Sequence, residues 1–282
     1  MTMKNWTETQ QNRLIELNAD DQELCQTFED ETQRNRAFQN RVTELIKTQK
    51  SKLKKMRANE RRPELCTLSD QLIASLTGKG FVQVTTPTMM AKTLLEKMSI
   101  TDSHPLTKQI FWIDSKRCLR PMLAPHLYYI MKDLLRIWEK PIGIFEIGSC
   151  FRKESEGARH ANEFTMLNVC EFGLPMEERH ARLEELVGLV MKTCGIDNYK
   201  LETEESAVYG STIDVVGAEP EDLELGSGAM GPHPLDDAWK INETWVGIGF
   251  GVERLLMAKD KGNTLGKYTR SLTWLDGVRL NL

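Results

Sequence analysis

The sequence predicts an α+β protein in which a mostly antiparallel sheet is flanked by helices and preceded by a helical appendage. Residues 8 to about 60 contain no Gly or Pro and place sparse apolar residues at helical intervals. After Pro63 the apolar spacing is that of a core-facing helix, and from Phe81 the period changes to two. Predicted strands then outnumber crossover helices, which favours antiparallel pairing over a βαβ repeat.

The elements follow in order from these patterns. Residues 1–62 are expected to form two or three polar helices, and residues 63–282 the main domain. The main domain begins with a helix whose apolar face runs from Leu65 to Leu76, followed by a strand that Pro87 stops. Further strands are predicted at 109–113, 142–153, 163–172, 207–216, 222–230 and 244–250, and further helices near 124–138, 176–194 and 251–260.

The composition excludes several classes of protein. The chain has 282 residues, 40% of them hydrophobic, which is enough for a full core. The six cysteines form no CxxC or Cys/His cluster, so we expect neither a zinc site nor a disulfide scaffold but reduced thiols in the cytoplasm. There is no signal-peptide core and no apolar run of the roughly 20 residues that cross a bilayer, so no membrane association is expected.

The charge is distributed unevenly along the chain. From Lys47 to Arg62 there are eight basic residues and one acid, a net charge of +7, which leaves −11 on the rest of a chain whose total is −4. Such a stretch suits contact with a phosphate backbone, and a solvated helix face is the alternative. The candidate tRNA contacts are Lys47, Lys50, Lys52, Lys54, Lys55, Arg57, Arg61 and Arg62.

The segment 142–172 is the richest candidate site. Its first strand is predicted to present one face made of Glu146, Cys150, Arg152 and Glu154. The return strand presents a face made of Phe164, Met166, Asn168, Cys170 and Phe172. A hairpin therefore sets an arginine and a glutamate beside an aromatic ring, an amide and a thiol, which suits phosphate, base and substrate contacts. A surface hairpin with an Arg–Glu ion pair is the alternative.

A glycine ladder forms a second candidate site. Gly247, Gly249 and Gly251 occupy alternate positions, so one strand face is reduced to backbone, against which either a flat ligand or a closely packed helix is expected. Arg254 follows in the first turn of a helix, where the helix dipole disfavours a cation unless an anion pairs with it. A Rossmann fingerprint, a Walker loop, a Gly-x-Ser-x-Gly elbow and histidines at metal-ligand spacing are all missing, so P-loop and hydrolase functions are excluded.

Three motifs, in order along the chain, resemble the signature motifs of class II aminoacyl-tRNA synthetases. They are Gly80-Phe-Val-Gln-Val-Thr-Thr-Pro, then Phe151-Arg-Lys-Glu with Glu163-Phe-Thr-Met-Leu-Asn, and then Gly249-Phe-Gly-Val-Glu-Arg. Within that class, four segments resemble the pyrrolysyl-tRNA synthetase family. These are Leu119-Arg-Pro-Met-Leu-Ala-Pro-His-Leu-Tyr, Phe164-Thr-Met-Leu-Asn-Val-Cys, Val208-Tyr-Gly and Gly231-Pro-His-Pro-Leu-Asp.

The resemblance runs from about residue 5 to the carboxyl terminus and is greatest for the short form that lacks the amino-terminal tRNA-binding domain. It implies a ligase that uses ATP and Mg²⁺ to activate pyrrolysine and to transfer it to the amber-decoding tRNA(Pyl), with no DNA partner. It also implies a homodimer that rests on the first motif around Leu65–Pro87. The bacterial short form is a catalytic subunit paired with a separately encoded small tRNA-binding protein.

The resemblance also implies roles for particular residues. Arg152 holds the ATP α-phosphate, Glu154 reads the adenine amine, and Phe164 and Arg254 stack on the two faces of adenine, while Glu224 and Ser227 match the Mg²⁺ and phosphate contacts. Arg152, Arg254 and Glu224 form the implied catalytic set. The implied amino-acid pocket consists of Leu123, Ala124, Leu127, Tyr128, Met131, Asn168, Cys170, Tyr209, Trp245 and Gly247. Asn168 donates to the substrate's side-chain carbonyl, and Tyr209 closes over the pyrroline ring.

Two positions depart from the family pattern next to the pocket. His126 stands where Asn is common, and Thr244 stands where Pro is usual. Two alternatives remain: a synthetase-like tRNA-binding or regulatory module without catalysis, and a class II synthetase for another amino acid such as phenylalanine. The survival of the whole ATP set argues against the first alternative, and Asn168 with Cys170 on the pocket face argues against the second.

Overall fold

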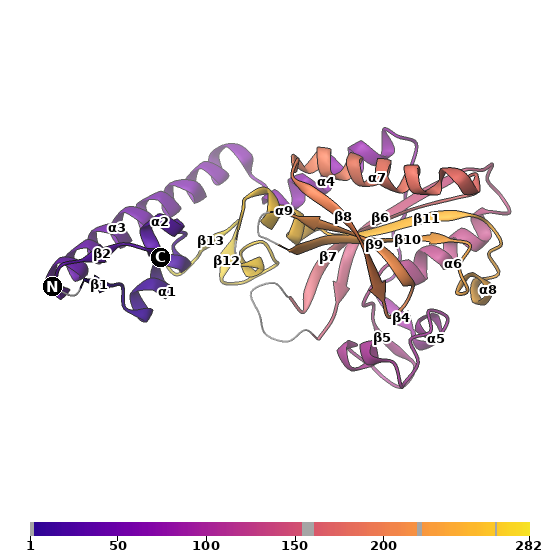
Figure 1. The fold of residues 1–282 in the computed structure, drawn as a ribbon, viewed down its shortest axis with the longest axis horizontal. Helices are drawn as coiled ribbons and strands as arrows, with labels where there is room; N and C mark the ends of the chain where they lie inside the picture. The colour runs from indigo at the N-terminus through magenta and orange to yellow at the C-terminus, as the bar shows by residue number, and fades with distance from the viewer. Residues whose placement is uncertain (1–2, 154–160, 219–221, 263) are drawn as a thin grey trace. The chain divides into compact units, whose positions relative to one another are not determined.

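The computed structural model describes residues 3–153, 161–218, 222–262 and 264–282 of the chain (Figure 1). They form two compact units, which we call the helical unit (Met1–Pro63 with Ser271–Leu282) and the sheet unit (Glu64–Arg270). The predicted α+β class with a mostly antiparallel sheet is confirmed. No helix in the described part of the chain has both the length and the apolar composition that crossing a membrane requires.

The helical unit is built from α1 (Glu8–Glu16), α2 (Asp21–Leu24) and α3 (Glu31–Lys55). A capping box begins α1, because Thr7 Oγ1 accepts from Gln10 N at 3.2 Å and Gln10 Oε1 accepts from Thr7 N at 3.1 Å. The short strands β1 (Lys4–Asn5) and β2 (Thr27–Phe28) pair antiparallel beside these helices. The core of the unit consists of Trp6, Leu14, Leu17, Phe28 and Leu45.

The carboxyl-terminal residues belong to the helical unit, whereas the sequence pattern assigned them to the main domain. They form a hairpin of β12 (Trp274–Leu275) and β13 (Val278–Arg279). Asn18 Nδ2 donates to the Gly277 carbonyl at 2.9 Å, and Arg279 forms an ion pair with Glu16. Asn18 and Gly277 are 259 positions apart. A contact of this range leaves no periodic signal in the sequence.

Within the described residues, the sheet unit is built on a seven-stranded sheet in the order β3-β6-β7-β11-β10-β9-β8. The pair β3–β6 is parallel, and the other neighbouring pairs are antiparallel. The strands are β3 (Val82–Gln83), β6 (Ile142–Phe151), β7 (Glu163–Phe172), β8 (Tyr199–Ser206), β9 (Gly210–Gly217), β10 (Leu223–Gly231) and β11 (Trp245–Gly251).

One strand expected from the sequence does not form as predicted, and one strand of the structure was not expected. The predicted strand at 109–113 begins at the last residue of a 3₁₀ helix (Pro105–Gln109) and forms only an isolated bridge from Trp112 to Cys118, beside the two-stranded sheet of β4 (Met89–Ala91) and β5 (Arg117–Leu119). Strand β8 was not predicted because its charged sequence has no apolar alternation. Strand β8 lies at the edge of the sheet, and this position explains its charged side chains, since charges on an edge strand prevent pairing with other chains.

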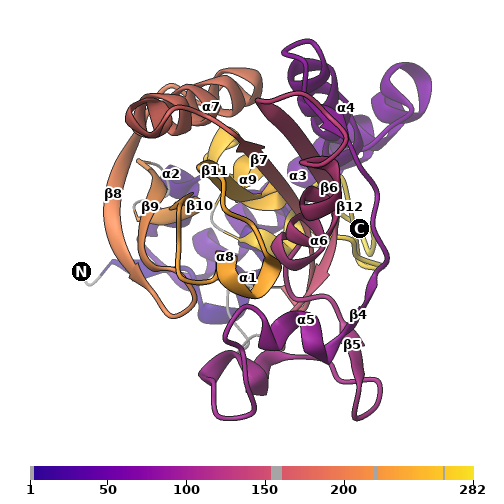
Figure 2. The ribbon, with the colours of Figure 1, turned by 90° about the vertical axis from the view of Figure 1, so that its right-hand side faces the viewer.

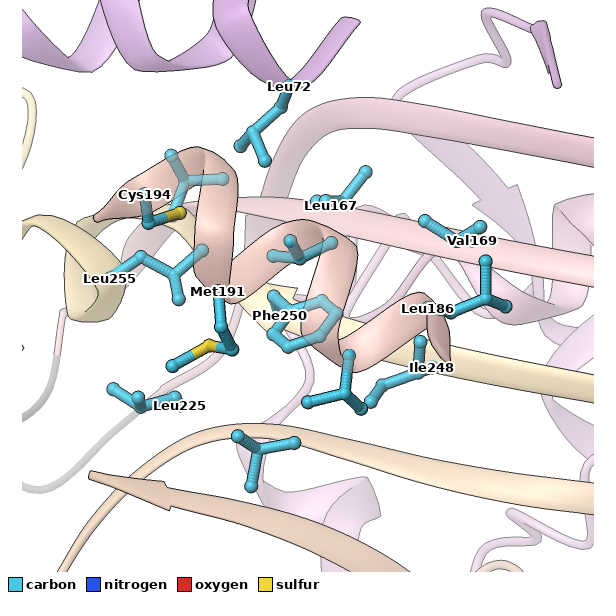
Figure 3. Close-up of a cluster of buried hydrophobic side chains, with 14 of the residues drawn as sticks. Leu72, Leu167, Val169, Leu186, Met191, Cys194, Leu225, Ile248, Phe250 and Leu255 are labelled. Carbon is cyan, nitrogen blue, oxygen red and sulfur yellow. The ribbon is translucent and has the colours of Figure 1, made fainter. Parts of the chain in front are cut away.

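One face of the sheet is closed by helices. Figures 1 and 2 show α4 (Glu64–Thr77) and α7 (Arg179–Cys194) along this face. Together with α9 (Val252–Lys259), they pack on apolar side chains that alternate along the middle strands. Figure 3 shows part of this core, with Leu72, Leu167, Val169, Leu186, Met191, Cys194, Leu225, Ile248, Phe250 and Leu255 labelled.

The other face is covered only in part. Helix α6 (Ala124–Leu134) packs there, and the short helices α5 (Lys92–Glu96) and α8 (Asp236–Trp239) lie on the same side (Figure 2). The apolar cluster beneath α6 includes the aromatic residues Tyr128, Phe172, Trp239 and Trp245. Because these helices cover one end of the face, the rest remains open for a site.

A buried ion pair holds the first motif against β6. Arg120 Nη1 lies 2.7 Å from Glu146 Oε1, with side-chain exposures of 4% and 2%. The same carboxylate accepts from Thr86 N at 3.1 Å and from Thr86 Oγ1 at 2.7 Å. A Cβ at Gly148 would overlap the Arg120 guanidinium, so glycine is required there. Both charges are satisfied inside the protein, and removal of either leaves the other without its counterion.

We expect Arg120→Met to lower the free energy of unfolding by about 3–5 kcal/mol, the cost of leaving one buried charge unpaired. The matched control is Arg117→Met, because Arg117 pairs with Asp114 at the same 2.7 Å but is 58% exposed. An exposed pair is worth at most about 1 kcal/mol. Urea denaturation of both variants measures the difference, and equal losses would contradict the role of the buried pair.

Candidate active site

A cavity of about 300 Å³ opens on the partly covered face of the sheet unit. Its walls come from the β6–β7 hairpin, β10, β11, the start of α6 and the turn between β8 and β9. The predicted site residues that line it are Ala124, Leu127, Tyr128, Arg152, Phe164, Asn168, Cys170, Tyr209, Glu224, Ser227, Trp245, Gly247 and Arg254. Segments that the sequence separates by more than 100 residues therefore meet in one space.

The β6–β7 hairpin places a cation beside an aromatic ring, as its alternation predicts. Cys150 pairs with Phe164 in the ladder, and Arg152 N donates to Asn162 O at 3.0 Å just beyond it. Arg152 Nε donates to the Pro121 carbonyl at 2.9 Å, and the guanidinium carbon lies 5.4 Å from the centre of the Phe164 ring. The main-chain contact orients the guanidinium at the cavity wall. The predicted adenine contact Glu154 lies outside the described residues.

The glycine ladder forms the cavity floor. A Cβ built on Gly249 would lie 3.3 Å from Met166 Cε, and one on Gly247 would lie 3.5 Å from the Trp245 ring. The nearest atoms at both positions belong to side chains of the sheet, so the alternative of a closely packed helix does not hold here. A methyl group would make ordinary contacts at Gly247, and at Gly249 it would only require the flexible end of Met166 to shift slightly. The packing of the protein therefore does not require glycine at these positions, and we interpret the glycines as keeping space for a ligand.

Arg254 and Glu224 form a pair at one end of the cavity. Arg254 Nη1 donates to the Glu224 main-chain oxygen at 3.0 Å and lies 3.6 Å from its carboxylate. This carboxylate is the anionic partner that the position of Arg254 in the first turn of α9 requires. Nearby on β10, Ser227 Oγ donates to Asp214 Oδ1 at 2.6 Å. The sequence analysis missed Asp214, which faces Ser227 across the β9–β10 ladder.

The side-chain oxygens of Glu224, Ser227 and Asp214 suit Mg²⁺ that is bound together with a nucleotide. Carboxylate and hydroxyl oxygens from Glu224, Ser227 and Asp214 are the hard donors that Mg²⁺ prefers. No group of three or more His, Cys, Asp or Glu side chains that could hold a metal ion occurs among the described residues. The residues therefore suit an ion held by one or two protein oxygens together with substrate phosphates, which is the usual arrangement for nucleotide-bound Mg²⁺.

The opposite end of the cavity is apolar and aromatic. The Tyr128 ring stacks on Trp239 at 5.4 Å between ring centres and meets Trp245 edge-on at 5.6 Å. Burial raises the pKa of both the Tyr128 and the Tyr209 phenols, so both hydroxyls stay protonated. The predicted pocket residues Leu123 and Met131 do not reach the cavity surface, since both are fully buried behind this wall.

The two departures from the family pattern have structural explanations. The His126 ring is buried behind the wall and lies 3.1 Å from Thr86 Oγ1 through Nδ1, and burial, with the nearby Arg120, lowers its pKa. Thr244 Oγ1 donates to the Leu174 carbonyl, outside the cavity lining. Neither side chain shapes the cavity surface, so the pocket is defined by the predicted wall residues and not by these substitutions.

Two acidic residues near the site were not identified from the sequence. Glu253 is 1% exposed, and its carboxylate accepts from Thr165 N and Thr165 Oγ1 at 2.8 Å, which ties α9 to β7. Burial raises the pKa of this carboxyl, and the Thr165 hydrogen bonds oppose the rise. Asp236 Oδ2 accepts from Trp245 Nε1 at 2.9 Å and from His233 N at 2.7 Å. An acid within an otherwise apolar and glycine-rich segment was the available signal for Glu253.

A family model described as the class II core domain of tRNA synthetases (F) matches residues 48–265. That range includes the first motif, the hairpin and the glycine ladder. The chain therefore belongs to the class II tRNA synthetase family, and the resemblance drawn from the three motifs is confirmed.

Within this class, the chain is similar to solved pyrrolysyl-tRNA synthetases. One crystal structure, from Desulfitobacterium hafniense, is 51% identical with a TM-score of 0.93 and covers 99% of both chains. A second structure of a synthetase from that organism is 50% identical, with a TM-score of 0.90 and coverage of 99% of this chain and 96% of the other.

Curated relatives are more distant. A phenylalanine–tRNA ligase alpha subunit from Phytoplasma australiense is 28% identical over 180 residues, which are 58% of this chain and 50% of that protein. The chain thus spans about half the length of the curated relatives it matches.

We expect the cysteines to differ in reactivity according to burial. Burial raises the pKa of the Cys118 thiol to about 11 and those of Cys150 and Cys194 to about 12, and it also raises the pKa of Cys170. The reactive thiolate forms only as the pH rises toward these values. At pH 8, iodoacetamide should label the exposed Cys25 and Cys66 and spare the other four, as measured by peptide mass spectrometry.

Labelling in guanidinium chloride should modify all six and serves as the control. Rapid labelling of Cys170 in the folded protein would contradict its interpretation as a wall residue.

Proposed function

We propose that this protein activates pyrrolysine with ATP and transfers it to the amber-decoding tRNA(Pyl). The observation that carries the proposal is that one cavity combines a charged half with an apolar half. Its charged half has Arg152, Phe164 and Arg254 above a glycine floor, and its other half is an aromatic pocket with one amide, Asn168. The 51% identity to a pyrrolysyl-tRNA synthetase over 99% of both chains supports the choice of amino acid.

The charged half suits a nucleotide. We propose that adenine lies between the Phe164 ring and the Arg254 guanidinium, with stacking on one face and a cation–π contact on the other. We propose that Arg152, oriented by its bond to the Pro121 carbonyl, neutralises charge that develops on the α-phosphate. Glu224 and Ser227 are proposed to hold Mg²⁺, which supplies charge neutralisation on the phosphate oxygens when it is bound.

The apolar half suits a long, weakly polar side chain. Leu127, Tyr128, Cys170 and Trp245 offer mainly apolar surface, and the half-buried Asn168 amide offers a donor. An amide left unpaired in the complex costs about 1–3 kcal/mol, which disfavours amino acids without a side-chain carbonyl. This requirement argues against phenylalanine, although a phenylalanine–tRNA ligase subunit is among the relatives. We propose that Tyr209 covers the far end of the side chain.

The proposed reaction needs no nucleophile from the protein. The α-carboxylate of the amino acid is ionised at neutral pH, since such groups have a pKa of about 3.3–3.7. It attacks the α-phosphorus, an oxygen–phosphorus bond forms, and the bond to the bridging oxygen breaks as pyrophosphate leaves. A ribose hydroxyl of the tRNA then attacks the carbonyl carbon of the adenylate, and AMP leaves. The protein contributes alignment and charge stabilisation. Because no thiolate takes part, the raised pKa of the Cys170 thiol in the cavity wall does not impede the reaction.

The partners are proposed from the surface of each unit. All eight basic residues between Lys47 and Arg62 are exposed, in the last part of α3 and the residues after it, which supports contact with tRNA phosphates. We also propose a homodimer through the segment Leu65–Pro87, as the first motif implies. The same proposal includes a separately encoded small protein that assists in tRNA binding. The six cysteines, all within the described residues and all free, support a cytoplasmic location.

The direct test is ATP–pyrophosphate exchange with purified protein. We expect exchange with pyrrolysine or an Nε-carbamoylated lysine and none with phenylalanine or lysine. Exchange with a standard amino acid and none with the lysine derivatives would refute the proposal. Arg152→Ala should lower the exchange rate by about 100- to 1,000-fold, the usual effect of removing a group that stabilises transition-state charge. Retention of most activity would refute the role of Arg152.

Gly249 on β11 and Gly226 on the neighbouring β10 test whether a glycine keeps space for a ligand or for packing within the sheet. Gly249→Ala should keep the free energy of unfolding within about 1 kcal/mol and raise the KM for ATP by about 5- to 150-fold, because its methyl group enters the cavity. The matched variant is Gly226→Ala, whose Cβ would lie 2.6 Å from the Phe250 ring and 2.7 Å from Gly249 O. It should lose about 1–3 kcal/mol of stability through overpacking. Urea denaturation and exchange kinetics measure both, and a destabilised Gly249→Ala protein would contradict the assignment.

A further inference from the structure

Two histidines hold the turn that carries Tyr209, and the sequence analysis assigned neither of them. The turn connects β8 to β9 and consists of Ala207, Val208 and Tyr209. His104 Nε2 lies 3.1 Å from the Ala207 carbonyl, and His233 Nε2 lies 2.9 Å from the Tyr209 carbonyl. The two rings approach from different elements, since His104 precedes the 3₁₀ helix Pro105–Gln109 and His233 precedes α8.

The hydrogen-bond partners define the direction of each bond. Leu106 N donates to His104 Nδ1 at 3.2 Å, and Leu235 N donates to His233 Nδ1 at 3.2 Å. A backbone N–H can only donate, so each Nδ1 is the acceptor and carries no hydrogen. Each Nε2 therefore carries the hydrogen of the neutral ring and donates to a turn carbonyl, which can only accept. Both rings are thus fixed in the same tautomer.

The His233 contact is linked to the cavity wall. The Tyr209 ring meets His233 edge-on at 5.6 Å and lies 6.2 Å from Trp245. Asp236 Oδ2 accepts from both His233 N and Trp245 Nε1, so one buried carboxylate positions the histidine and the indole together. These contacts form a closed cycle that runs from Tyr209 through His233, Asp236 and Trp245 back to Tyr209. These contacts within the protein therefore define the position of the turn beside the cavity.

We propose that His104 and His233 are positioning residues that clasp the β8–β9 turn so that Tyr209 covers the amino-acid end of the cavity. The inference rests on the proposed function for its substrate but not for its structural part. Neither histidine lines the cavity, so each acts through the turn. We call the two contacts, His104 to Ala207 and His233 to Tyr209, the clasp. The clasp restricts the turn before substrate binds, so less conformational entropy is lost on binding. This lowers the KM for the amino acid and leaves ATP binding unchanged.

The structural part is tested without substrate, by hydrogen–deuterium exchange of the full-length protein. The amides of Val208 and Tyr209 donate to Ser206 Oγ at 3.3 and 3.4 Å, so their exchange reports opening of the turn. His104→Leu and His233→Leu should each speed this exchange about fivefold, the change that one net hydrogen bond gives. The matched control is His180→Leu, an exposed histidine on α7, which should leave the turn unchanged. Unchanged exchange in both clasp variants overturns the inference, whatever the protein activates.

The functional part is tested by kinetics with the amino acid that the wild-type protein activates. His233→Leu should raise the KM for that amino acid about fivefold, with kcat and the KM for ATP within about twofold of wild type. In a Tyr209→Ala background the same substitution should change the KM less than about twofold, because the clasp acts through Tyr209. His233→Gln should restore most of the loss, since its amide can donate to the Tyr209 carbonyl. Additive effects, or an equal rise in the KM for ATP, overturn the positioning role.

Discussion

Side chains on successive residues of β7 and β11 point to opposite faces of the sheet, and both the core and the site depend on this alternation. Leu167, Val169, Ile248 and Phe250 face α7 and α9, where they are fully buried. Their neighbours Asn168, Cys170, Gly247 and Gly249 face the cavity. A slip of one residue in the register would exchange the two sets and destroy the core and the site together. The apolar face therefore also maintains the register on which the site depends.

The charged groups of the site are placed at the ends of this rigid sheet by hydrogen bonds to main-chain atoms. Arg152 donates to Pro121, Arg254 donates to Glu224, and Glu253 accepts from Thr165. Main-chain partners move little, so these hydrogen bonds define the positions of the two guanidinium groups. For a reaction that depends on alignment and on charge stabilisation, this preorganisation is the main contribution that a protein can make.

The order and type of most large elements could be predicted from the sequence, because their periodicities are local. The hairpin 142–172, the helix after Pro63 and the strand that carries Gly247 were all predicted with small errors at their ends. The exceptions have physical reasons. Strand β8 is a charged edge strand that needs no apolar alternation, and residues 109–113 show apolar spacing but pair with β5 through only one isolated bridge. The resemblance to class II synthetases supplied the roles, which periodicity alone could not.

The candidate site divides in the same way. Arg152, Phe164, Asn168 and the glycine ladder could be identified from alternation within single strands, since neighbours on one strand face are two residues apart in the sequence. Asp214, Asp236 and the two clasp histidines could not, because each acts on a segment that folding alone brings near it. His104, for example, contacts Ala207 at a separation of 103 residues. The sequence by itself thus determined which side chains line the cavity wall, through the alternation along single strands. Only the tertiary structure determined how the β8–β9 turn is held beside the cavity, because hydrogen bonds between distant segments depend on the folded path of the chain.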